Sequence, residues 1–173
     1  FAFSTAGGDT ASALASGSTV VIKGHSAHAK TSSLVFDAIK KAIEKCGMHP
    51  YTVQHVLGSG STVGKALVQH PETTGVGFTG SLSGGTTLWK LANDRERPIP
   101  VFAEMSSINP VVFLPDTLEK NTESLAKTYA ASITLGMGQF CTNPGLLLAV
   151  KSKVLDDFLA LLGNEIEVIT PQK

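Results

Sequence analysis

The feature that most constrains the fold is a regular alternation of short apolar runs with longer segments of helical spacing. The short runs are rich in β-branched residues and are bounded by turn-forming residues, which is typical of buried strands. They lie at residues 18–23, 52–57, 75–79, 99–103, 109–114, 146–150 and 166–169. Strands that alternate with helices predict βαβ units with parallel strands and right-handed crossovers.

The segments between these runs carry apolar residues every three or four positions, as amphipathic helices do. Ser4 or Thr5 is expected to cap the first helix, which Gly17 ends. Further helices are expected at residues 31–45, 63–69, 86–93, 119–135 and 154–162. The sequence therefore predicts an α/β fold, with a mostly parallel sheet flanked by helices.

Composition excludes several classes of protein. The 173 residues fit one domain by length, and the 14 basic residues balance the 14 acidic ones. This balance gives no electrostatic footprint for nucleic acid. Cys46 and Cys141 form no CxxC or Cys/His spacing, which argues against a structural zinc site and fits a cytoplasmic location. No apolar run reaches the roughly 18 residues that span a membrane.

Several chemically suited residues fall at the predicted carboxyl ends of strands, where open α/β sheets bind ligands. Lys23 ends an apolar strand, from which it could reach a phosphate, although a surface lysine is about as common there. Residues 77–81 lead from a strand to a helix start whose free N–H groups suit a pyrophosphate. This pattern is neither GxGxxG nor a Walker loop, so alone it is a weak signal.

Two further residues suit covalent chemistry. Cys141 lies on a loop between a glycine-rich approach and an Asn143-Pro144-Gly145 turn, where nearby N–H groups favour the nucleophilic thiolate. An isolated cysteine is more often a small buried hydrophobe. Glu104 follows an apolar strand, and a carboxylate in such surroundings suits a general base. Taken alone, a glutamate there is more often solvated.

The histidines and the other cysteine carry weaker signals. His25 and His28 share a loop and could touch a ligand. His55 lies mid-strand and is interpreted as structural. Cys46 belongs to the C-terminal turn of a helix and is expected to be packed and inert.

Four of these motifs, taken in order, resemble the aldehyde dehydrogenase superfamily. They are Val21-Ile22-Lys23, residues 77–81, Ala103-Glu104-Met105 followed by Asn109-Pro110, and Gly138-Gln139-Phe140-Cys141. The resemblance covers residues 1 to about 150 and implies a Rossmann-like sheet. The amino-acid sequence of residues 3–15, 101–105 and 140–145 is most similar to the bacterial 2,5-dioxovalerate (α-ketoglutarate semialdehyde) and NADP-dependent long-chain aldehyde dehydrogenase branch.

The resemblance implies a role for each matching residue. Cys141 would add to the aldehyde carbon, give hydride from the thiohemiacetal to the nicotinamide, and be left as a thioester. Glu104 would activate the water that hydrolyses the thioester, and the Cys141 N–H would form half of an oxyanion hole.

The resemblance also implies a dinucleotide site. Lys23 would bind the adenine-side ribose or its phosphate, and residues of the turn would bind the pyrophosphate. The residues assigned to that turn are Gly77, Thr79, Gly80 and Ser81. Members specific for NAD often place an acid where this chain has Ser26, so we expect NADP, with NAD possible.

Family members are several hundred residues long, so the chain resembles a fragment of a longer protein. Residues 1–100 are expected to be part of the NAD(P)-binding domain. Residues 101–173 are expected to be the start of an incomplete catalytic domain. The parent protein is expected to be a homo-oligomer, and this chain alone to have weak or no dehydrogenase activity.

Two other functions stay open at this point. The first is a non-catalytic nucleotide-binding or interaction module derived from the same fold. The second, a thiol hydrolase pairing Cys141 with a histidine, is disfavoured because all five histidines precede position 71. The aldehyde substrate is left between a dicarboxylic semialdehyde and a long-chain aldehyde.

Overall fold

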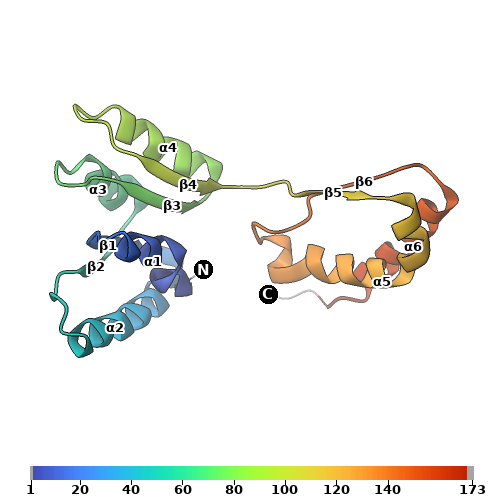
Figure 1. Cartoon of the computed structure of the whole chain (residues 1–173), viewed down its shortest axis with the longest axis horizontal. Helices are drawn as coiled ribbons and strands as arrows, with labels where there is room; N and C mark the ends of the chain where they lie inside the picture. Colours follow the sequence, from blue (N-terminus) through green and yellow to red (C-terminus); the bar gives the residue numbers. More distant parts are fainter. Residues whose placement is uncertain (1, 171–173) are drawn as a thin grey trace. The chain divides into compact units, whose positions relative to one another are not determined.

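A computed structural model, which describes residues 2–170, divides the chain into two compact units (Figure 1). Unit 1 runs from Phe1 to Met105, and unit 2 from Ser106 to Lys173. The predicted domain ranges 1–100 and 101–173 include residues 1 and 171–173, which lie outside the described part. The assignment of those ranges to cofactor binding and to catalysis stays a prediction.

Unit 1 alternates helices and strands along its length. Its elements are η1 (Ala2–Ala6), α1 (Gly8–Ala15), β1 (Val20–Gly24), η2 (Ser26–His28), α2 (Ala29–Lys45), β2 (Val53–Leu57), η3 (Gly60–Gly64), α3 (Lys65–Gln69), β3 (Val76–Gly80), α4 (Leu82–Asn93) and β4 (Val101–Met105). Unit 2 contains β5 (Pro110–Phe113), α5 (Pro115–Thr134), η4 (Leu135–Gly138), β6 (Leu146–Ala149) and α6 (Lys153–Glu167).

The α/β fold with parallel strands is confirmed. Within residues 2–170 the strands pair two by two, β1 with β2, β3 with β4 and β5 with β6, and every pair is parallel. A parallel pair needs a crossover connection, and here each crossover contains a helix. Among the same residues, no helix has the length and apolar content needed to cross a bilayer.

Two linked hydrogen bonds, one buried and one partly buried, join three elements of unit 1. The hydroxyls of Thr5 and Ser32 lie 2.7 Å apart, and Ser32 Oγ lies 2.8 Å from His55 Nε2. The His55 ring stacks on Phe36 with centroids 5.2 Å apart. Buried polar groups need such partners, so these bonds tie η1, α2 and β2 together. His55 is therefore a packed, hydrogen-bonded residue of the strand.

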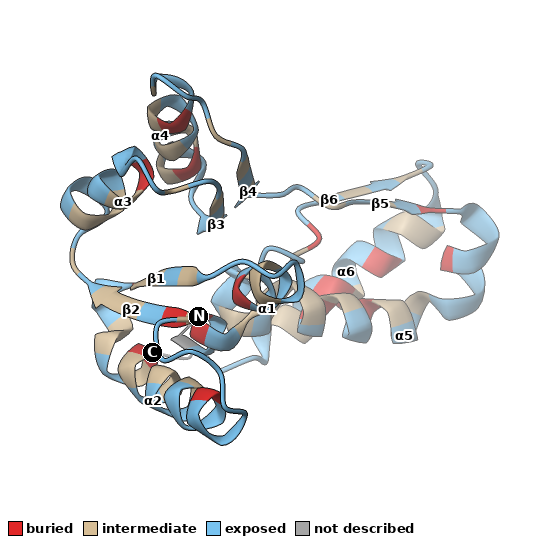
Figure 2. Ribbon diagram, turned by 60° about the vertical axis from the view of Figure 1, so that its left-hand side comes forward, coloured by how far each residue is buried: buried red, intermediate tan, exposed pale blue. Residues whose placement is uncertain are grey.

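One face of the β5–β6 pair packs against α5 and α6 and forms the core of unit 2 (Figure 2). Phe113 lies at its centre, with ring centroids 4.9 Å from Tyr129 and 5.1 Å from Phe158. The buried members of this core are Phe113, Leu118, Ala126, Ala130, Phe158 and Leu162. The opposite face carries exposed apolar residues, which are Val112, Leu114, Leu146, Leu148 and Val150.

Three sequence expectations about local structure are wrong. Neither Ser4 nor Thr5 caps the first helix, which begins at Gly8 with Gly7 as its N-cap. Thr5 is instead turned into the interior, where its hydroxyl binds that of Ser32. The expected strand at 166–169 does not form, because α6 continues to Glu167 and packs Leu162 and Ile166 on the core with helical spacing. Cys46 is exposed and not packed.

We expect Phe158→Ala to lower the free energy of unfolding by about 3–5 kcal/mol, since it empties the centre of a packed core. Phe158 is 1% exposed, whereas the neighbouring Leu159 is 52% exposed. Leu159→Ala is therefore the matched control, with an expected change within about 0.5–1 kcal/mol. Urea unfolding followed by circular dichroism measures both, and similar losses for the two variants would contradict the assigned core.

His55 predicts a dependence of stability on pH. Burial lowers the pKa of His55 below 6.5, and the Asp37 carboxylate opposes this shift. As pH falls through about 6.5, the unfolded chain takes up the proton before the folded chain does, so His55 makes the folded state less stable. We expect the stability of the unaltered chain to fall more steeply from pH 7 to pH 5 than that of His55→Gln. Parallel curves from urea titrations would refute this expectation.

Candidate functional site

Cys141 lies at the centre of a tight turn in unit 2. The Asn143 N–H donates to the Phe140 carbonyl at 3.1 Å, which places Cys141 and Thr142 at the two central positions. The thiol-bearing residue is exposed. The turn therefore presents the cysteine to solvent while its backbone is closed by a hydrogen bond.

The side chain of Asn109, which directly precedes β5, holds this turn by hydrogen bonds. Asn109 Nδ2 donates to the Cys141 carbonyl at 2.7 Å and to the Asn143 carbonyl at 2.8 Å. The Ser107 hydroxyl also donates to the Cys141 carbonyl. The Gly145 N–H donates to the Ile108 carbonyl at 2.9 Å. Two segments more than 30 positions apart in the sequence are thereby joined.

A second amide anchors the turn to the end of α5. Asn143 Nδ2 donates to the carbonyls of Ile133 at 2.8 Å and Gly138 at 3.1 Å. The approach to Cys141 has a left-handed backbone at Gly136, Met137 and Gly138, with φ of 57°, 59° and 71°. Glycine accepts such angles at little cost, which explains the glycine-rich wording before the cysteine.

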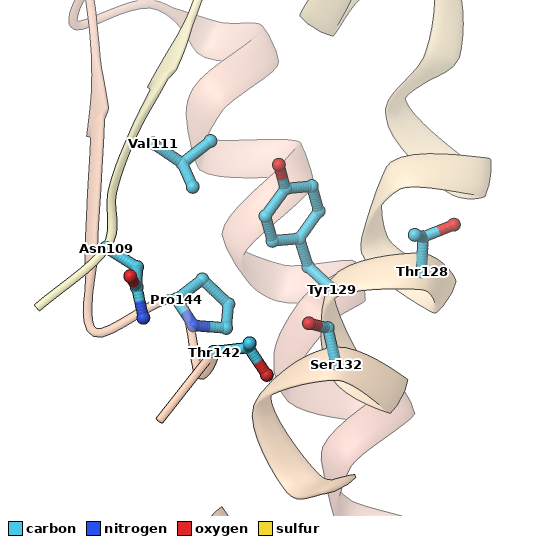
Figure 3. A pocket seen from close by; sticks show the side chains of 7 residues that line it. All are labelled: Asn109, Val111, Thr128, Tyr129, Ser132, Thr142 and Pro144. Carbon is cyan, nitrogen blue, oxygen red and sulfur yellow. The ribbon is translucent and has the colours of Figure 1, made fainter. Parts of the chain in front are cut away.

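A pocket of about 270 Å³ opens beside the turn (Figure 3). It is lined by Asn109, Val111, Thr128, Tyr129, Ser132, Thr142 and Pro144. The lining offers four hydroxyls and one amide and no charged side chain, so its chemistry suits a neutral polar group. Sequence reasoning missed Tyr129 and Ser132 as pocket residues. Their spacing of three on α5 was a usable signal, because such residues share a helix face.

Glu104 lies in β4, where it pairs with Thr79 of β3. The strand begins at Val101, two residues later than expected, since neither Pro98 nor Pro100 has an N–H for a ladder. Glu104 is exposed, so the apolar surroundings expected for its carboxyl do not form within unit 1. Its action on Cys141 stays a prediction, because the two residues belong to different units.

Lys23 lies near the carboxyl end of β1 and is held there by its neighbour strand. Lys23 pairs with Val56 of β2, and its Nζ donates to the Gly58 carbonyl just beyond that strand at 3.0 Å. The ammonium group is therefore held at the sheet edge, and within residues 2–170 it has this one hydrogen bond, so it can donate to further acceptors.

The turn between β3 and α4 forms a second polar edge in unit 1. Ser81 caps α4, and its hydroxyl accepts from the Gly84 N–H at 3.1 Å. The Thr79 hydroxyl donates to the Asp9 carboxylate at 3.3 Å. A side chain at Gly80 would lie 2.7 Å from the Phe78 ring, and one at Gly77 would lie 3.3 Å from Asp9. A side chain at either position would therefore require its neighbour to move.

The loop after Lys23 contains an unpaired polar atom. His28 Nδ1 is buried and has no hydrogen-bond partner within residues 2–170. Its ring lies 5.2 Å from that of His25, and Ser26 is exposed between them. Over the same described range, no group of three or more His, Cys, Asp or Glu residues is placed to hold a metal ion.

Comparisons with known proteins agree on one family. The model described as "Aldehyde dehydrogenase family" matches residues 1–172. Alpha-ketoglutaric semialdehyde dehydrogenase 2 of Azospirillum brasilense is 54% identical over 91% of this chain and 30% of its own length. Alpha-ketoglutaric semialdehyde dehydrogenase of Acinetobacter baylyi is 48% identical over 99% of this chain and 32% of its own length.

Solved structures give the same result for the fold. An NAD-dependent benzaldehyde dehydrogenase from Corynebacterium glutamicum matches with a TM-score of 0.76 and 27% identity, over 96% of this chain and 33% of that one. A 3,6-anhydro-L-galactose dehydrogenase in complex with NAP matches with a TM-score of 0.74 and 25% identity, over 91% of this chain and 31% of that one. The chain therefore spans about a third of the length of the relatives it matches.

Proposed function

The chain belongs to the aldehyde dehydrogenase family, and on that premise we propose that Cys141 is the nucleophile in the NAD(P)-dependent oxidation of an aldehyde to a carboxylic acid. The observation that carries this proposal is the exposed Cys141 at the centre of a turn in which the Phe140 and Cys141 carbonyls already accept hydrogen bonds. A thiolate there can meet a substrate from solvent while the backbone around it stays fixed.

The reaction follows from the groups on this turn. The Cys141 thiolate forms a bond to the aldehyde carbon, and the carbonyl oxygen becomes an oxyanion in the thiohemiacetal. The Cys141 N–H is the donor offered to that oxygen. A bound nicotinamide would supply the acceptor for the hydride on the same carbon. Collapse of the oxyanion then restores the carbonyl and leaves an acyl thioester on Cys141.

Release of the acid needs a base. We assign this role to Glu104, whose exposed carboxylate is free to take a proton from water. The resulting hydroxide adds to the thioester carbon, the carbon–sulfur bond breaks, and the carboxylic acid and the Cys141 thiolate separate. The proposal thus requires Glu104 and Cys141 to approach each other in the active protein.

The residues of unit 1 fit a bound dinucleotide phosphate. Lys23 offers an ammonium group at the sheet edge, and α4 offers a capped N-terminus beside Gly80 and Ser81. His28, whose Nδ1 has no partner among the described residues, lies two positions after Ser26. Ser26 is uncharged, so it would not repel the 2′-phosphate of NADP as an acid at that position would. We therefore propose that NADP is the cofactor, with NAD possible.

The substrate proposed is a semialdehyde such as 2,5-dioxovalerate (α-ketoglutarate semialdehyde). Its support is the identity of 54% and 48% to two proteins named for that activity. We also propose that the parent protein is a homo-oligomer and that it is cytoplasmic.

Alkylation of the two cysteines tests the proposed nucleophile. Cys46 and Cys141 are both exposed, so accessibility does not separate them. With limiting iodoacetamide, we expect Cys141 to react at least about tenfold faster than Cys46, and Cys141→Ser to abolish the fast reaction. Peptide mass spectrometry reads both sites. Equal rates, together with binding of NADP⁺, would instead support a non-catalytic nucleotide-binding module.

Substitution of Lys23 tests the dinucleotide site. Lys23→Met keeps the length of the side chain and removes its charge, so we expect the dissociation constant for NADP⁺ to rise about tenfold or more, the effect of losing one charge-assisted hydrogen bond. Lys45→Met, at the exposed end of α2, is the matched control. Titration calorimetry measures both variants, and an unchanged affinity in Lys23→Met would remove this residue from the site.

A further inference from the structure

We propose that Asn109 is a positioning residue, which sets the backbone around Cys141 so that the Cys141 N–H stays available to the substrate oxygen. This inference rests on the proposed function and adds to it a residue with no direct part in the chemistry. It concerns only unit 2, in which both residues lie.

The hydrogen bonds of Asn109 use its whole donor capacity. A side-chain amide nitrogen carries two hydrogens. Asn109 Nδ2 lies 2.7 Å from the Cys141 carbonyl and 2.8 Å from the Asn143 carbonyl, with Ser107 Oγ further away at 3.1 Å. The two closest acceptors are backbone atoms of the turn itself. The amide therefore holds the turn at two points.

The backbone at position 109 also selects for asparagine. Asn109 has φ of 43°, in the left-handed region. Asparagine and aspartate accept this conformation better than other residues with side chains. Of these two, only asparagine donates hydrogen bonds to carbonyls at neutral pH. The position thus combines an unusual backbone with an obligatory donor.

Both peptide planes that flank Cys141 are held, one by the Asn143 N–H and the other by Asn109. The Phe140 carbonyl accepts from the Asn143 N–H, and the Cys141 carbonyl accepts from Asn109. A trans peptide directs its N–H away from its carbonyl, so the Cys141 N–H points away from the Phe140 oxygen. Within residues 2–170 this N–H has no hydrogen-bond partner. It is a preorganised donor beside the thiol, as an oxyanion site requires.

The parallel register explains why this asparagine reaches this turn. Pro110 pairs with Leu146, so the residues just before them, Asn109 and Gly145, enter their strands side by side. The hydrogen bond from the Gly145 N–H to the Ile108 carbonyl joins the same two segments just before their strands begin. A side chain at Gly145 would lie 3.0 Å from the Ile108 carbonyl, so the two entering segments pass too closely for one.

The test compares two substitutions at Asn109 in the full chain. Asn109→Asp keeps the shape but replaces the donor with a carboxylate that faces two carbonyl oxygens. Asn109→Gly keeps the left-handed backbone without strain and removes only the amide. The control is Asn121→Asp, since Asn121 in α5 is exposed and donates to a single carbonyl, that of Thr117, at 3.0 Å.

The quantity measured is the ratio of the alkylation rates of Cys141 and Cys46 from pH 6 to pH 10, in folded chain and in chain unfolded by urea. We expect both Asn109 variants to lower the ratio about tenfold, toward the unfolded value, while circular dichroism stays that of the folded chain. Asn121→Asp is expected to keep the ratio of the unaltered chain at every pH. A purely structural role would leave the ratio of folded Asn109→Gly unchanged.

The outcomes separate this inference from the proposed function. If Asn109→Gly folds and keeps the high ratio, positioning by Asn109 is overturned while Cys141 remains the proposed nucleophile. If the unaltered chain already shows a ratio near one, the nucleophile and the positioning role are both overturned. A ratio that falls in both Asn109 variants and not in Asn121→Asp supports the inference.

Discussion

Parallel pairing of neighbouring strands is the constraint on which the rest of the structure depends. In two parallel strands the amino ends lie together at one edge of the pair, and the carboxyl ends lie together at the opposite edge. The β1–β2 pair accordingly brings Lys23 beside Gly58, and the β3–β4 pair brings Thr79 beside Glu104. The residues in each contact are distant in sequence, so strand register brings them together and not their nearness along the chain.

The same constraint places Cys141 before the amino end of a strand, whereas Lys23 and Glu104 lie near the carboxyl ends of theirs. The Cys141 turn lies in the connection from α5 to β6, so it reaches the amino end of a strand and not the carboxyl end. Asn109 occupies the corresponding position before β5. The core of Phe113, Tyr129 and Phe158 then fixes α5 against the strands and keeps the end of that helix within reach of Asn143.

In the proposed function, the two units divide the chemistry between them. Unit 1 carries Lys23, the His28 loop and the Ser81 cap, to which the proposal assigns the phosphates. Unit 2 carries the thiol and the amides that hold its turn. A dehydrogenase needs both sets, since the thiohemiacetal carbon must meet a hydride acceptor. Membership of the aldehyde dehydrogenase family joins these two sets in one proposed reaction.

The sequence by itself indicated most of the strands and helices and their parallel direction, because short β-branched runs and helical periodicity are local signals. The family followed from a different signal, the resemblance of four ordered motifs to known members. Local signals wrongly predicted a strand at residues 166–169, whereas packing of Ile166 on the core continues α6 to Glu167. They also did not show that Thr5 would turn inward to Ser32, or that Asn109 would bind the Cys141 carbonyl. Only the tertiary structure decided those contacts, because each depends on strand register and helix packing between distant segments.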